Sequence, residues 1–185
     1  MKRIENYETV QASSGEFARP TAGGYICKII DVEDIPLNPN TNKGDYLRIE
    51  YDIADGEFKD YYKDQFNKWG GNWNASFIRS YKEKAQGMFK HFTNCIEASN
   101  AGYEWDWNEK GLIGKVVGLV LGEEEYKNSA GEIKTKLVVS QIKTVEEIKN
   151  GDFKVPVPKK LSVDASANSD AFTILPNDSE DDLPF

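Results

Sequence analysis

The sequence predicts a mainly β domain of five strands and one helix, followed by an acidic C-terminal tail. Short segments rich in β-branched and aromatic residues recur along the chain. One longer segment has apolar residues at helical spacing. The chain has 185 residues, a length typical of one domain or of one domain with a tail.

The strands are predicted from hydrophobic alternation and from turn residues. Between residues 47 and 53, apolar side chains occupy every second position, which is the period of a half-buried strand. Asp55-Gly56 and residues 128–131 are turn signals. The five expected strands cover residues 24–33, 47–53, 57–66, 113–126 and 133–143.

One helix is predicted between the third and the fourth strand. Ser80 and Glu83 have the spacing of a capping box. The apolar residues that follow share one helical face. They are Ala85, Met88, Phe89, Phe92 and Ile96. Asn100 and Gly102 are expected to end the helix.

The predicted order β-β-β-α-β-β is that of the OB-fold, a five-stranded barrel that binds oligonucleotides or oligosaccharides. A small α+β sandwich would show the same order. In this interpretation residues 1–22 form an irregular lead-in and residues 23–155 form the OB-fold domain. Residues 156–185 form a disordered acidic tail, because their composition is too polar to bury a core.

The negative charge of the chain is concentrated in this tail. The formal net charge is -8, and residues 161–185 contain six acids and no Lys or Arg. The first 160 residues therefore carry only -2. Because a nearly neutral body can present a basic groove, the net charge does not exclude a nucleic-acid-binding protein.

The segment from Lys59 to Phe92 interleaves nine aromatic residues with seven basic and three acidic ones. Proteins that bind single strands stack bases on aromatic rings and contact phosphates with Lys and Arg. Trp69 and Trp73 stand among Asn, Gly and Lys, so we expect exposed rings that hold bases, with loop-anchoring packing as the alternative. The expected DNA-binding residues are Trp69, Trp73, Phe66, Tyr62, Lys63, Lys68, Arg79 and Arg48.

The chain ends in Asp178-Ser-Glu-Asp-Asp-Leu-Pro-Phe185, an acidic run before an apolar residue, Pro and Phe. This arrangement resembles the C-terminal tip of bacterial and phage single-stranded DNA-binding proteins. The strand order and the aromatic density over about residues 23–145 agree with that family. The N-terminal strand sequence usual in the common bacterial type is missing, so the chain looks more like a divergent phage or prophage member.

The resemblance implies binding to single-stranded DNA with little sequence preference. It also implies recruitment of replication or recombination proteins by the tip. The partner-binding residues would be Asp181, Asp182, Leu183, Pro184 and Phe185.

The sequence does not favour an enzyme, a cofactor or a metal site. His91 is expected on a helix surface, and Cys27 and Cys95 have no further ligands at zinc spacing. The run 123–125 of three Glu is expected to be a solvated strand edge. No apolar run is long enough to span a membrane and no signal peptide is evident, so we expect the cytoplasm of a bacterial or phage-infected cell.

Two other functions fit the same sequence. An acidic protein-interaction module, such as a DNA mimic, would use the net charge of -8 as its binding surface and would not bind nucleic acid. An OB-fold barrel that binds oligosaccharides would stack sugar rings on the same tryptophans.

Overall fold

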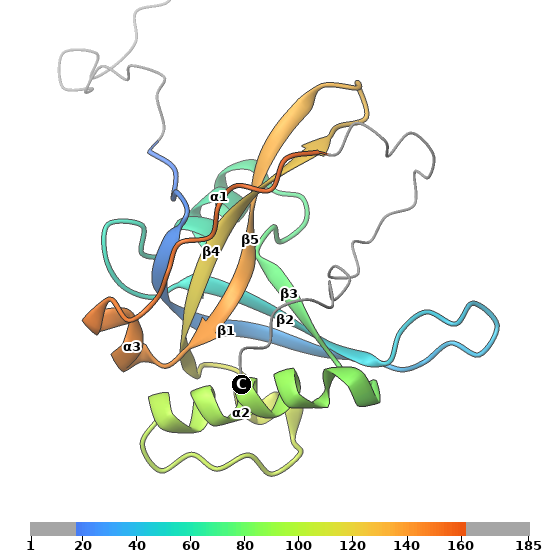
Figure 1. Cartoon of the computed structure of the whole chain (residues 1–185), viewed down its shortest axis with the longest axis vertical. Coiled ribbons are helices and arrows are strands. Elements are labelled where there is room, and N and C mark those ends of the chain that lie inside the picture. The colour runs from blue at the N-terminus through green and yellow to red at the C-terminus, as the bar shows by residue number, and fades with distance from the viewer. Residues whose placement is uncertain (1–17, 162–185) are drawn as a thin grey trace, which may run out of the picture.

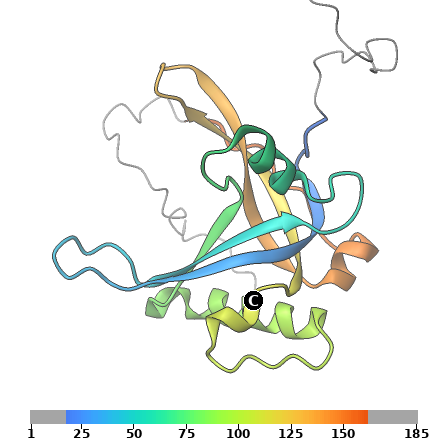
Figure 2. The same cartoon turned by 180° about the vertical axis from the view of Figure 1, so that it is seen from behind.

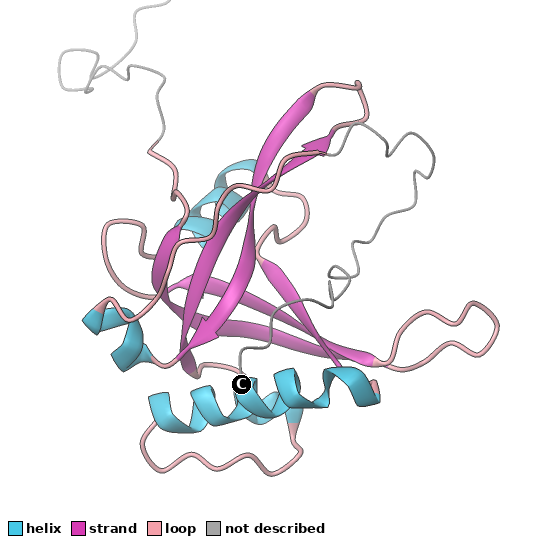
Figure 3. Cartoon of the chain, in the orientation of Figure 1, coloured by secondary structure: helices cyan, strands magenta, loops and turns pink. Residues whose placement is uncertain are grey.

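In the computed structural model, which describes residues 18–161, β1 lies at the centre of a five-stranded antiparallel sheet. The strand order is β3-β2-β1-β4-β5 (Figures 1 and 3). The strands are β1 (Gly23–Ile35), β2 (Tyr46–Ile53), β3 (Ser76–Ser80), β4 (Val116–Lys127) and β5 (Ile133–Lys143). The helices are α1 (Tyr61–Trp69), α2 (Gln86–Ser99) and α3 (Val145–Asn150), with 3-10 turns η2 (Glu83–Ala85) and η3 (Glu109–Leu112).

The sheet is open. Within residues 18–161, β3 pairs only with β2, and β5 pairs only with β4. The expected mainly β architecture of five strands is therefore confirmed, but no ladder of hydrogen bonds closes the sheet into a barrel.

The third strand lies later in the chain than predicted. Residues 57–66, expected to be a strand, form a turn and most of α1. Phe58, Tyr61 and Tyr62 stand at i, i+3 and i+4, a helical spacing that places their rings on one face. The third strand is instead β3, within a segment we expected to be irregular. It alternates buried Phe77 with the more exposed Ser76 and Ile78.

The core lies between the inner face of the sheet and α2. The alternation predicted for residues 47–53 is confirmed, since all four apolar side chains of this strand are buried. From α2, Phe89, Phe92 and Ile96 pack against them. Cys27 on β1 and Cys95 on α2 are free thiols in the same core.

The C-terminal end of α2 agrees with the prediction, and its N-terminal end does not. Its end at Asn100 is confirmed, and the Asn100 side-chain amide donates to the carbonyls of Ile96 at 2.7 Å and Val116 at 2.8 Å. The prediction that Ser80 and Glu83 cap this helix is wrong, because Ser80 is the last residue of β3 and α2 begins only after η2. Met88, predicted to share the apolar face of this helix, is 52% exposed.

Helix α3 and residues 151–161 fold back over the sheet (Figure 1). We call residues 145–161, helix α3 included, the C-terminal strap. A Cβ on any of three glycines of β1 and β4 would overlap a strap side chain. The pairs are Gly24 with Phe153, Gly118 with Ile148, and Gly122 with Pro156. The strap ends beside β4, where the Lys159 N–H donates to the Glu123 carbonyl and its carbonyl accepts from Glu125 N–H, both at 2.9 Å.

The packed body thus continues to Leu161, past the boundary expected after residue 155. Most of the predicted acidic tail, including its tip, lies outside the described residues, as do residues 1–17 of the predicted lead-in. No helix between residues 18 and 161 has the length and apolar character needed to cross a membrane.

The close contact beneath α3 gives a test of the strap. Gly118→Ala would place a Cβ 2.4 Å from Ile148 Cγ1 and 2.6 Å from the Thr144 carbonyl oxygen. We expect the free energy of unfolding, measured by urea denaturation, to fall by about 1–3 kcal/mol. The control is Gly87→Ala on α2, where nothing lies within 4 Å, and which should leave stability unchanged or raise it by up to about 1 kcal/mol. Equal midpoints for Gly118→Ala and the wild type would contradict this packing.

Candidate nucleic-acid interface

Helix α1, which carries most of the predicted DNA-binding residues, is fixed to the sheet by one buried carboxylate. Asp52 on β2 is only 2% exposed. Its Oδ1 accepts hydrogen bonds from the backbone N–H groups of Ile53 at 2.8 Å and Tyr62 at 3.0 Å. Its Oδ2 accepts from Lys63 N–H at 3.1 Å. Asp52 therefore satisfies free N–H groups in the first turn of α1, a task usually performed by the N-cap residue.

Asp60, the N-cap residue of α1, makes no such side-chain bond. Burial raises the pKa of the Asp52 carboxyl, and the three backbone hydrogen bonds oppose this rise by favouring the charged form. The side chain therefore acts in positioning the helix, with its oxygens turned to the backbone.

The outer face of α1 exposes two large aromatic rings. Trp69, the last residue of the helix, is 67% exposed, and Phe66 is 42% exposed. The Lys68 ammonium lies 5.0 Å from the centroid of the Trp69 ring. Lys63 is also exposed, on the same short helix. Sequence-predicted aromatic and basic side chains thus share one exposed helix; we call Lys63, Phe66, Lys68 and Trp69 the α1 patch.

Trp73 anchors the segment that follows α1. Its indole Nε1 donates to the Tyr51 carbonyl oxygen at 3.0 Å, and its ring packs partly against the core. Its ring centroid lies 5.8 Å from that of Phe66. Of the two tryptophans expected to be exposed, Trp69 is open to solvent, whereas Trp73 is half-buried and fits the packing alternative.

Tyr62 faces the sheet. Its ring contacts the rings of Tyr51 and Tyr61, with centroids 5.7 Å and 5.2 Å away. Burial raises the pKa of the Tyr62 hydroxyl to about 12. Its position indicates that it packs α1 against the sheet, unlike the more exposed Phe66 and Trp69.

The two predicted arginines lie on β2 and β3, and neither offers an open positive charge. The Arg79 guanidinium lies 5.0 Å from the Phe77 ring centroid and 6.0 Å from that of Phe92, and it donates to the Ile78 carbonyl at 2.8 Å. Burial lowers the pKa of Arg79 to about 10. Strand alternation sends this side chain inward with Phe77, because both occupy odd positions of β3.

Arg48 lies on the outer face of β2 and is neutralised there. It pairs with Glu33 at 2.7 Å and with Glu50 at 3.6 Å. Asp31 adds a further exposed carboxylate on β1, paired with Lys110 at 3.6 Å. Acidic groups therefore flank Arg48, and this face of β1 and β2 is poorly suited to phosphates.

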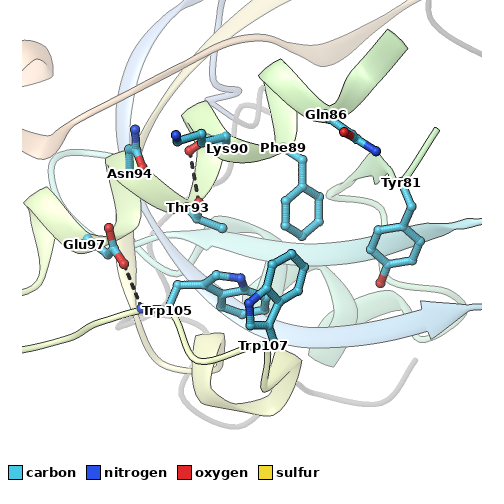
Figure 4. A pocket seen from close by; sticks show the side chains of 9 residues that line it. All are labelled: Tyr81, Gln86, Phe89, Lys90, Thr93, Asn94, Glu97, Trp105 and Trp107. Carbon is cyan, nitrogen blue, oxygen red and sulfur yellow. Dashed lines mark hydrogen bonds between the residues drawn. The ribbon is translucent and has the colours of Figure 1, made fainter. Parts of the chain in front are cut away.

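A second aromatic cluster was not predicted. Tyr81, Phe89, Trp105 and Trp107 line a cavity of about 610 Å³ between α2 and the loop that leads to η3 (Figure 4). Trp105 and Trp107 stand in the sequence as Trp-Asp-Trp, a pair like Trp69 and Trp73 in polar surroundings. That similarity was the available signal, but it lies beyond Phe92, where the predicted aromatic and basic segment ends.

No protein-family model matches the chain, and no curated protein matches its sequence. The resemblance of the C-terminal residues to single-stranded DNA-binding proteins therefore stays a prediction. Asp181, Asp182, Leu183, Pro184 and Phe185 lie outside the described residues.

Removal of the Asp52 carboxylate should loosen α1. Asp52→Ala leaves backbone N–H groups without their acceptor, so we expect the free energy of unfolding to fall by about 1–3 kcal/mol. Urea denaturation followed by tryptophan fluorescence measures this loss. Asp64→Ala is the control, an exposed acid on the same helix, and should change stability by about 0.5 kcal/mol or less. The anchoring role is refuted if the two variants are equally stable.

Proposed function

We propose that this chain binds single-stranded DNA with little sequence specificity through the α1 patch. We further propose that its C-terminal tip recruits replication or recombination proteins. The observation that carries the first proposal is the exposed Trp69 ring with the Lys68 ammonium 5.0 Å from its centroid. An exposed indole beside a cation offers a base a surface for stacking and offers the adjoining phosphate a counter-charge.

The composition of the patch favours single strands over duplexes. Unpaired bases present their flat faces, which stack on aromatic rings whatever the base. Phe66 and Trp69 supply two exposed rings, and Lys63 and Lys68 supply positive charge on the same helix. Binding by stacking and phosphate contact explains a lack of sequence preference, because neither interaction reads base edges.

The strand order supports an OB-type topology for the domain. Three strands follow one another as a meander, β1 pairs with both β2 and β4, and α2 stands between β3 and β4. The OB-fold is a partly open five-stranded Greek-key barrel. In such folds the outer face of strands 2 and 3 binds ligands. Here the acids around Arg48 disfavour that face of β2, so we assign the first contact to α1 instead.

A protein-interaction module that binds no nucleic acid is the alternative. The carboxylates of Asp31, Glu33 and Glu50 on the outer face of β1 and β2 favour it, because they form an acidic surface on the folded body. A titration with oligo-dT separates the two functions, since only the first gives saturable quenching of tryptophan fluorescence that weakens with salt.

Replacement of the exposed indole should weaken DNA binding. Trp69→Ala removes one stacking surface, so we expect the affinity for oligo-dT to fall about 5- to 150-fold. Fluorescence anisotropy of labelled oligo-dT measures this change without relying on the lost fluorophore. Val157→Ala, an exposed apolar residue on the strap, should bind as the wild type does. Unchanged affinity in Trp69→Ala would remove the α1 patch as the binding site.

The salt dependence should identify the lysines that contact phosphates. The slope of log K against log salt is negative, and for single strands each lost phosphate contact reduces its magnitude by about 0.7. Lys63→Ala combined with Lys68→Ala should therefore reduce the magnitude by about 1.4. Arg48→Ala should leave the slope unchanged because Arg48 is already paired with carboxylates. A slope of smaller magnitude in Arg48→Ala, with no change in the lysine variant, would place the DNA strand on β2 instead.

A further inference from the structure

The cavity between α2 and the loop before η3 is built from aromatic rings with a polar rim. Phe89 and Trp107 lie nearly parallel, with an interplanar angle of 11° and ring centroids 6.3 Å apart. Trp105 packs against both rings, with centroids 6.1 Å from Phe89 and 6.0 Å from Trp107. Figure 4 shows the two indoles side by side, with Tyr81 across the cavity from the end of α2 that carries Glu97.

Trp107 is presented to solvent in an unusual way. It is 79% exposed, and its φ of 65° lies in the left-handed region, which costs a non-glycine residue about 1–2 kcal/mol. Because the ring is mostly exposed, its packing adds little to the stability of the fold and does not offset the energy of this strain. Such strain recurs at binding sites, where it serves to hold a side chain in position for a ligand.

The polar groups of the rim suit a nucleotide. Lys90 lines the cavity, and exposed Lys82 and Lys84 follow Tyr81 in the chain. None of these three lysines is ion-paired within residues 18–161. The side-chain amides of Gln86 and Asn94 also line the cavity, and both residues are exposed.

Three carboxylates near the cavity have hydrogen-bond partners within the fold. Glu97 Oε1 accepts from Trp105 N–H at 2.7 Å. Asp34 Oδ1 accepts from the Tyr81 hydroxyl at 2.9 Å, and Asp106 Oδ1 accepts from Asn108 N–H at 3.2 Å. Of the two charged side chains that line the cavity, Glu97 is held by the hydrogen bond from Trp105, and Lys90 is the one that complements phosphate.

The cavity and the α1 patch are joined by one edge strand. Trp73 precedes β3 and Tyr81 follows it, so β3 runs from the α1 side of the sheet to the start of the α2 segment (Figure 1). Figure 2 shows α1 and α2 on opposite sides of β1 and β2. The chain from Trp73 to Tyr81 spans at most about 26 Å. The residues of β3 that alternate with inward Phe77 and Arg79 are Ser76, Ile78 and Ser80, and none of them is charged.

We infer that this cavity is a second stacking site, which takes an unpaired base of the same DNA strand while Lys82, Lys84 and Lys90 contact its phosphates. The inference rests on the proposed function and extends it, because β3 leads from the segment that follows α1 to Tyr81 at the cavity. A DNA strand that follows β3 from one site to the other would cover a length compatible with the site sizes of about 4–16 nucleotides found for single OB-folds.

The test compares full-length variants in the binding of labelled oligo-dT of about 20 nucleotides. Trp107→Ala should weaken binding about 5- to 150-fold, and its effect should multiply with that of Trp69→Ala in the double variant. Met88→Ala is the matched control, an exposed apolar residue of α2 that does not line the cavity, and should bind as the wild type does. As a second measurement, Lys82→Gln with Lys84→Gln should reduce the magnitude of the salt slope by about 1.4.

The outcomes distinguish the two proposals. If Trp107→Ala and the lysine variant both match the wild type while Trp69→Ala binds weakly, the second site is overturned and the proposed function stands. If the wild type itself binds no oligo-dT, both fall. If Phe185→Ala alone shifts the tryptophan emission without DNA, and Trp107→Ala abolishes that shift, the cavity holds the chain's own C-terminus and the inference is overturned.

Discussion

The hydrogen bonds of the Asp52 carboxylate set the position of everything between β2 and β3. They draw the first turn of α1 against the end of β2, although Asp52 and Tyr62 are ten residues apart. The buried ring of Tyr51 also contacts the Tyr62 ring, and the Tyr51 carbonyl accepts a hydrogen bond from the Trp73 indole N–H. With both ends of the connection held in this way, the last turn of α1 is the part that projects. The exposure of Trp69 is thus a consequence of a buried acid on another element.

The tryptophans of this chain differ in burial and in their partners. Trp73 is half-buried and its indole N–H donates to a backbone carbonyl, so its ring is a structural support. Trp69 and Trp107 are instead mostly exposed, one beside a lysine and the other stacked on a phenylalanine. Aromatic density alone therefore does not distinguish a binding surface from a core. Burial and the partner of each ring do.

Sequence patterns predicted the parts of this fold in which local rules apply. The alternation in β2, the two long strands β4 and β5 with their turn, and the end of α2 at Asn100 all follow from neighbouring residues. Residues 57–69 were assigned wrongly because their aromatic content favours a strand, whereas the group that caps the helix lies on β2. Arg79 was taken as a surface cation because its burial against Phe77 and Phe92 depends on the packing of α2. Neither the capping of α1 by Asp52 nor the burial of Arg79 can be predicted from residues that are adjacent in the sequence.

The C-terminal strap pairs beside an edge of β4 and so affects whether copies of this chain associate. β1 ends its pairing with β4 at Leu121, so the outer half of β4 would present unpaired N–H and C=O groups on that side. Lys159 covers part of this stretch by pairing as a short parallel bridge beside Glu124. Exposed strand edges recruit strands of other molecules and promote aggregation. The C-terminal strap therefore covers a strand edge that would otherwise pair with other molecules. A protease that removed the strap would leave a folded body prone to self-association.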